Sequence, residues 1–131
     1  MVRLIVADVG GRVLVLRRAP DSTDGGMWCL PGGKVDYGDT VENAAIRELQ
    51  EETSLRATDL RFLFYQDSLP PAPGRMHCIN LYLKCAFEGE VALNDESTDA
   101  AWIGPDDIAK FPLSFRNGEA LLHYWKGTGA L

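Results

Sequence analysis

The chain has 131 residues, 46% of them hydrophobic, which suits one domain with a sizeable buried core. Its formal net charge of −6 disfavours duplex nucleic acid and anionic membranes, so neither is expected as a partner. An anionic substrate would need another source of positive charge, and a divalent metal ion held by carboxylates is the simplest one.

The cysteines and the N-terminus indicate a reducing compartment. Cys29, Cys78 and Cys85 are odd in number and irregularly spaced, so free thiols are expected rather than disulfides or a zinc site. The N-terminal apolar run is broken at Asp8, which does not fit a signal peptide, and no stretch approaches the roughly 20 apolar residues of a membrane span. We therefore expect a cytoplasmic protein.

Strands are predicted before the first helix. Two β-branched and Leu-rich runs, Arg3–Val9 and Arg12–Arg18, flank Gly10-Gly11 and predict a hairpin with a tight glycine turn. A polar loop follows over residues 19–26. A short strand over Met27–Leu30 then ends at a Pro-Gly-Gly turn.

Strands and helices alternate in the rest of the chain. Good helix formers predict a helix over Thr40–Thr53 with Thr40 as its N-cap. The later elements are expected, in order, as strands over Leu60–Tyr65, Met76–Phe87 and Ala100–Ile103, a helical turn over Asp106–Lys110, and a C-terminal helix over Phe115–Trp125 with Phe115, Leu121, Leu122 and Trp125 as packing residues. Without a repeat or linker, the pattern predicts one α/β domain over residues 1–131.

The predicted helix carries acidic residues on the side that should face the protein body. At about 100° per residue, Glu48, Glu51 and Glu52 share the side of Ala44 and Ala45. Three carboxylates gathered there would repel one another and raise their own pKa values unless cations lie between them. Mg²⁺ or Mn²⁺ suits such oxygen ligands, and zinc is disfavoured because no His or Cys is close in sequence. The alternative is a solvated acidic face.

Two neighbouring features support a site at this helix. Arg47 precedes Glu51 by four residues, so it predicts an ion pair that orients this carboxylate, with an ordinary surface pair as the alternative. Gly32 and Gly33 lack a Cβ, which lets the backbone approach a metal or a phosphate.

These residues form one long motif with fixed spacing. Gly33 is followed after five residues by Asp39, and after seven more by Arg47-Glu48-Leu49-Gln50-Glu51-Glu52-Thr53-Ser54-Leu55. The motif resembles the signature of the Nudix hydrolases, G-x5-E-x7-R-E-U-x-E-E-x-G-U, where U is a bulky apolar residue. The resemblance extends upstream through Trp28, Leu30 and Pro31-Gly32-Gly33-Lys34-Val35. It implies an α/β/α sandwich with a mixed β-sheet between helices.

Two positions depart from the family's pattern. Asp39 stands in place of Glu, so its contacts are expected to shift or to pass through water. Ser54 stands in place of Gly just after the helix. The left-handed conformation common at that position costs a residue other than glycine about 1 kcal/mol.

The resemblance implies roles for individual residues. Glu48, Glu51, Glu52 and the carbonyl of Gly32 would bind Mg²⁺, with Mn²⁺ as a substitute, and Arg47 would orient the carboxylates. The general base would be Glu48 or a downstream acid. Glu96 is the candidate for that acid, with Asp95 and Asp99 as rivals and a plain loop acid as the alternative.

The implied activity is metal-dependent hydrolysis of a phosphoanhydride bond in a nucleoside diphosphate linked to another moiety. A (deoxy)nucleoside triphosphate cut to monophosphate and pyrophosphate is the first expectation. ADP-ribose or nucleotide-sugar hydrolysis, and a non-catalytic nucleotide-binding module, are the alternatives. Many relatives are dimers, so a homodimer is a further expectation.

Substrate-binding candidates come from basic and aromatic residues. Arg17, Arg18 and Lys34 are placed to meet phosphates, unless they are only strand-end and loop charges. The aromatic candidates for stacking on a base are Trp28, Tyr65 and Tyr82, with a place in the core as the alternative.

Overall fold

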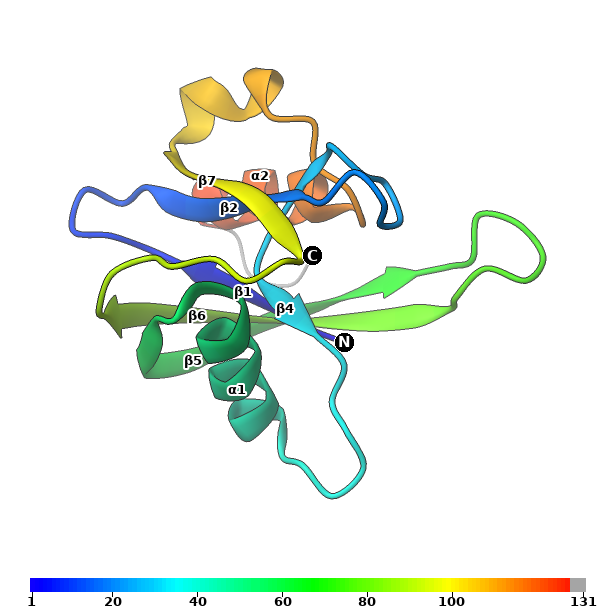
Figure 1. Cartoon of the computed structure of the whole chain (residues 1–131), viewed down its shortest axis with the longest axis horizontal. Helices are drawn as coiled ribbons and strands as arrows, with labels where there is room; N and C mark the ends of the chain where they lie inside the picture. The colour runs from blue at the N-terminus through cyan, green and yellow to red at the C-terminus, as the bar shows by residue number, and fades with distance from the viewer. Residues whose placement is uncertain (128–131) are drawn as a thin grey trace.

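Two β-sheets form the centre of the fold (Figure 1). The computed structural model describes residues 1–127, so the last four residues of the predicted domain lie outside the described residues. The strand order is β4-β1-β6-β5 in one sheet and β3-β2-β7 in the other. The strands are β1 (Val2–Val6), β2 (Val13–Arg18), β3 (Trp28–Cys29), β4 (Gly32–Gly33), β5 (Arg56–Ser68), β6 (Cys78–Glu88) and β7 (Ser97–Ile103). The helices are α1 (Val41–Thr53), the 3₁₀ helix η1 (Pro105–Lys110) and α2 (Asn117–Lys126).

Helices α1 and α2 cover opposite sides of this β-structure. Leu14 of β2 belongs to the same buried cluster as Leu49 of α1, whereas its neighbour Val15 packs in a second cluster with Leu121 of α2. Because successive residues of a strand point to opposite faces, strands covered on both sides read as continuous apolar runs. β1 and β6 are parallel and the other pairs of their sheet are antiparallel. The predicted α/β/α sandwich with a mixed sheet is therefore confirmed.

The predicted hairpin between the first two strands is wrong. β1 pairs in parallel with β6, and β2 pairs with β3 and β7 in the other sheet. The connection does turn tightly, since Asp8 Oδ1 accepts hydrogen bonds from the Gly10 and Arg12 amides at 2.9 Å each, and a bridge links Ala7 to Val13. Beyond that bridge the strands diverge, because each is buried on both faces and takes its partners from distant segments.

Several element boundaries also differ from the predictions. β5 and β7 are longer than expected, since polar residues at their ends still pair through the backbone, whereas β6 runs from Cys78 to Glu88, close to the predicted Met76–Phe87. The C-terminal helix starts at Asn117 because Phe115 and Arg116 have φ values of +57° and +59°, which a helix does not accept. Leu122 is 44% exposed and is therefore not a packing residue. No helix within residues 1–127 is both long and apolar enough to cross a membrane.

Helix α1 is capped by a side chain at its N-terminus and by the Ser54 backbone amide, which donates to the Gln50 carbonyl, at its C-terminus. The Asn43 amide donates to Thr40 Oγ1 at 3.1 Å, which confirms Thr40 as the N-cap. Ser54 follows the last helical residue in the left-handed conformation, with φ of 66°. Its hydroxyl donates to the Ala92 carbonyl at 3.0 Å. This bond offsets part of the strain that a glycine would avoid.

We expect Ser54→Ala to lower the free energy of unfolding by about 1 kcal/mol, because it keeps the left-handed strain and loses the bond to Ala92. Ser54→Gly should change it by less than about 0.5 kcal/mol, because relief of strain offsets the lost bond and the added freedom of the unfolded chain. Urea unfolding of the two variants checks this. Wild-type stability in Ser54→Ala would show that the bond contributes nothing.

Candidate active site

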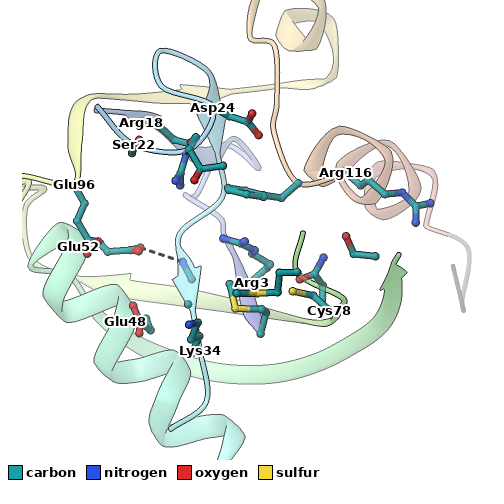
Figure 2. A pocket seen from close by; sticks show the side chains of 18 of the residues that line it. Arg3, Arg18, Ser22, Asp24, Lys34, Glu48, Glu52, Cys78, Glu96 and Arg116 are labelled. Carbon is teal, nitrogen blue, oxygen red and sulfur yellow. Dashed lines mark hydrogen bonds between the residues drawn. The ribbon is translucent and has the colours of Figure 1, made fainter. Parts of the chain in front are cut away.

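Two glutamates of α1 face a cavity of about 1120 Å³ beside β4. They reach it because Ala44, Ala45 and Leu49 bury the adjoining face of the helix. Glu52 Oε2 accepts a hydrogen bond from the Gly32 amide at 3.0 Å. In Figure 2, Glu48 and Glu52 lie on one side of the β4 segment together with Glu96. The cavity therefore has an acidic end built from α1 and the segment before β7.

Gly32 and Gly33 are required for different reasons. A Cβ on Gly33 would lie 2.4 Å from the Glu48 carboxyl carbon, so the absence of a side chain makes room for that carboxylate. A Cβ on Gly32 would lie 2.1 Å from the Val2 carbonyl oxygen, which the pairing of β1 with β4 holds in place. The missing side chain therefore makes room for the site at Gly33 and for strand pairing at Gly32.

Gly33→Ala is expected to fold, because the end of the Glu48 side chain can swing away from the new methyl group. Turnover should fall by about 10²-fold, because the carboxylate would leave its position by an ångström or more. Gly32→Ala should instead lose stability, since its clash is with backbone. Melting curves and turnover of both variants check this pair. Equal loss of stability in the two would contradict the separate roles.

Arg47 holds the acidic end in place. Its Nη1 lies 3.1 Å from Glu48 Oε1 and 3.8 Å from Glu51 Oε2. Its Nη2 lies 3.2 Å from a carboxylate oxygen of Asp36 and also 3.2 Å from one of Asp39. The arginine therefore links the loop before α1 to the helix and contacts the Glu48 carboxylate directly. The shorter Asp39 side chain keeps a direct contact with Arg47.

Burial disfavours the ionised form of the Glu48 and Glu52 carboxyl groups. It raises the pKa of Glu52 to about 8, opposed by the Gly32 hydrogen bond and reinforced by the charges of Glu48 and Glu96. Burial also raises the pKa of Glu48, against the neighbouring Arg47 guanidinium and together with the charges of Glu51 and Glu96. A bound cation would supply the positive charge that these groups lack.

The donor set fits a hard divalent cation, because it offers carboxylate oxygens beside Gly33, where a Cβ would take the place of the Glu48 carboxylate. Within residues 1–127, however, no three His, Cys, Asp or Glu side chains are gathered as ligands of one ion. Glu51 is directed to Arg47 and its side chain is 55% exposed. Glu48 and Glu52 are therefore the pair that lines the cavity, and Glu51 is not among its lining residues.

Of the three acidic residues proposed downstream of the motif, two line the cavity and one does not. Glu96 and Asp95 line the cavity, and the charge of Glu96 acts on both Glu48 and Glu52. Asp99 instead pairs with Arg17 at 3.6 Å in the other sheet. The structure thus brings Glu96 to the acidic cluster, and its chemical role stays a prediction.

Only some of the residues proposed to bind substrate line the cavity. Lys34 and Arg18 line the cavity. Arg17 and Trp28 are not among its lining residues. Arg17 forms an ion pair with Asp99 instead, and the Trp28 ring packs edge-on against Phe111 with ring centres 4.9 Å apart. Tyr82 is fully buried.

Residues that the sequence predictions missed build the opposite end of the cavity. Arg3 and Arg116 lie on the side of β4 away from Glu48 in Figure 2. Asn80 and Phe115 line the same cavity. The sequence carries a signal for Arg3, since it is a charged residue within the apolar run Val2–Val6. No comparable pattern marks Asn80 or Phe115, because pairing between distant segments places them.

Comparisons with known proteins agree with this architecture. A model of the NUDIX domain matches residues 1–124. The nucleoside triphosphatase NudI of Escherichia coli is 31% identical over 105 residues, covering 73% of this chain and 74% of that protein. NudI of Escherichia fergusonii is 29% identical over 108 residues with the same coverage. The crystal structure of a MutT Nudix hydrolase from Burkholderia pseudomallei has a TM-score of 0.82 and 29% identity, covering 92% of this chain and 93% of that one.

Proposed function

The chain belongs to the Nudix hydrolase family, and from this membership we propose that it cuts (deoxy)nucleoside triphosphates to the monophosphate and pyrophosphate with Mg²⁺. The family and its relatives make it a nucleotide pyrophosphohydrolase. The observation that carries the finer proposal is the pair Glu48 and Glu52, which face one cavity beside Gly32 and Gly33. The relatives named nucleoside triphosphatase favour a triphosphate over ADP-ribose or a nucleotide sugar.

In this proposal Glu48, Glu52 and the Gly32 carbonyl hold Mg²⁺, and Glu51 joins them. When bound, the ion neutralises charge on the phosphate oxygens and polarises the bond that is cut. Mn²⁺, which has similar ligand preferences, would substitute for it. Arg47 keeps the Glu48 carboxylate oriented, as its 3.1 Å ion pair supports.

We assign the proton of the attacking water to Glu96. It lines the cavity beside the acidic pair, whereas Glu48 is already engaged by Arg47. A carboxylate can accept that proton while water attacks phosphorus in line with the leaving group. Lys34, also in the cavity wall, is placed to bind a phosphate oxygen.

We also propose the partner and the cellular compartment of this protein. A nucleotide-like small molecule is the partner, and the cytoplasm, where thiols stay reduced, suits the free Cys29, Cys78 and Cys85. A homodimer stays a prediction. A single domain over residues 1–131 is also part of the proposal, and the NUDIX match over residues 1–124 supports the larger part of it.

The test is turnover on nucleoside triphosphates, ADP-ribose and nucleotide sugars with Mg²⁺ or Mn²⁺, with products separated by ion-exchange chromatography. The proposal expects a triphosphate to be preferred and to yield monophosphate and pyrophosphate in equal amounts. Preference for ADP-ribose or a nucleotide sugar would replace the substrate assignment. Absence of turnover on every compound with both metals would favour a non-catalytic nucleotide-binding module.

A further inference from the structure

Arg3 is a buried arginine with an unpaired nitrogen in its guanidinium group. The residue is 5% exposed, and its Nε has no hydrogen-bond partner among residues 1–127. It reaches the cavity from β1, at the end away from Glu48. A guanidinium stays charged at all ordinary pH values and only donates, so burying it without an acceptor is unfavourable. A ligand in the cavity is the natural source of that acceptor.

The Phe115 ring holds this guanidinium in place. The Cζ of Arg3 and the Cζ of Arg18 each lie 4.6 Å from the centre of the ring. Such contacts between a cation and an aromatic ring are favourable and restrict where the guanidinium can lie. Arg3 is therefore a positioned donor rather than a flexible charge.

A buried hydrogen-bond network sets the orientation of the amides next to Arg3. The Leu30 amide donates to Asn117 Oδ1 at 2.9 Å, so the other end of that side chain, Nδ2, donates to Tyr82 Oη at 3.2 Å. The Tyr82 hydroxyl then donates its own hydrogen to Gln66 Oε1 at 2.9 Å. The Leu30 amide thus fixes which atoms donate and which accept in the side chains of Asn117, Tyr82 and Gln66.

The network ends at Asn80. Gln66 Nε2 donates to the Arg116 carbonyl at 3.0 Å, and Gln66 Oε1 accepts from Asn80 Nδ2 at 3.2 Å. Because Nδ2 is committed to Gln66, Oδ1 is the end of Asn80 left to accept a hydrogen bond in the cavity that the residue lines. Arg3 is paired with Tyr82 in register, so Asn80, two residues before Tyr82, projects from the same face of the sheet. A donor and an acceptor thus lie on one cavity floor.

We propose that Arg3 and Asn80 select the nucleobase of the substrate by a lactam edge, the O=C–N–H group of guanine, hypoxanthine, uracil and thymine. Arg3 donates to the exocyclic oxygen and Asn80 Oδ1 accepts the ring N–H. In the same pose, adenine and cytosine would direct an amino donor at a guanidinium that has only donors. Leaving buried polar groups unpaired in this way discriminates strongly between substrates. This inference rests on the proposed function and adds the class of base.

The test compares kcat/KM on GTP, UTP, ATP and CTP for the wild type, Arg3→Met and Arg3→Lys, with the exposed Arg12→Met as the matched control. The wild type and the control should prefer GTP and UTP by about 10-fold or more. Both Arg3 variants should lose about 10-fold on GTP and UTP, mainly through KM, and change little on ATP and CTP. Arg3→Lys keeps the positive charge but loses the planar guanidinium with its fixed donors. It therefore tests the proposal even if Arg3→Met fails to fold.

Equal losses on all four triphosphates would overturn the proposal, because Arg3 would then bind a phosphate or sugar that they share. An unchanged preference in either Arg3 variant would overturn it as well. Thermal stabilisation by GMP, UMP, AMP and CMP without added metal gives a second readout. Selective stabilisation by GMP and UMP, lost in Arg3→Lys, would support base selection even without turnover, so failure of the proposed function is distinguishable from failure of this inference.

Discussion

Glu52→Gln is expected to lower turnover by about 10³-fold or more and to leave the fold intact. The substitution keeps an acceptor for the Gly32 amide, whose 3.0 Å bond holds this side chain against β4. It removes the negative charge that a divalent ion needs from its ligand. Steady-state rates with saturating Mg²⁺ measure the effect.

Glu42→Gln is the matched control, because Glu42 lies in the first turn of the same helix and is exposed to solvent. It should turn over at the wild-type rate. Turnover of Glu52→Gln within a few-fold of the wild type would contradict the assignment of Glu52, whatever the control shows.

The metal-free protein should become less stable as pH rises from the Glu52 pKa of the unfolded chain toward that of the folded chain. The ordinary value is 4.5, and burial raises it to about 8 in the fold. Between these values the folded state holds a proton that the unfolded state releases, so the free energy of unfolding falls with increasing pH. Below pH 4.5 the titration of Glu52 does not change the free energy of unfolding, and above about pH 8 its full destabilising effect is reached.

Glu52→Gln removes this titration. Without metal and at about pH 9, the variant should be more stable than the wild type by on the order of 1–3 kcal/mol, or several degrees in Tm. Mg²⁺ should stabilise the wild type more at about pH 8.5 than at about pH 6, because a metal ion competes with the proton for the carboxylate. Melting curves at the three pH values, with and without Mg²⁺, check both statements. A wild type that is equally stable across this range without metal would contradict the buried, uncompensated carboxyl group.

The acidic end of the cavity could be predicted because its residues are close in sequence. Helical geometry alone places Glu48 and Glu52 on the side of Ala44 and Ala45, and the structure confirms that this side faces the protein body. Glu51 is predicted on the same side, but it lies 3.8 Å from Arg47, is 55% exposed and does not line the cavity. Angular position on a helix does not include the pull of a neighbouring charge.

The pairing of strands could not be predicted in the same way. Asp8 and the glycines that follow it form a tight turn, yet β1 finds its partner β6 more than seventy residues further along the chain. Strands covered on both faces look alike in sequence, so turn chemistry alone does not identify their neighbours. The Arg3 end of the cavity depends on this pairing, and Asn80 and Phe115 reach it only through the tertiary fold.

Binding of Mn²⁺ without any substrate tests the central claim most directly, that Glu48 and Glu52 hold a divalent ion. Electron paramagnetic resonance counts free Mn²⁺ as protein is added, and requires no turnover. The account predicts binding to the wild type and to Glu42→Gln, and affinity weaker by about 10-fold or more in Glu52→Gln. Equal binding by all three proteins, or none by the wild type, would contradict it.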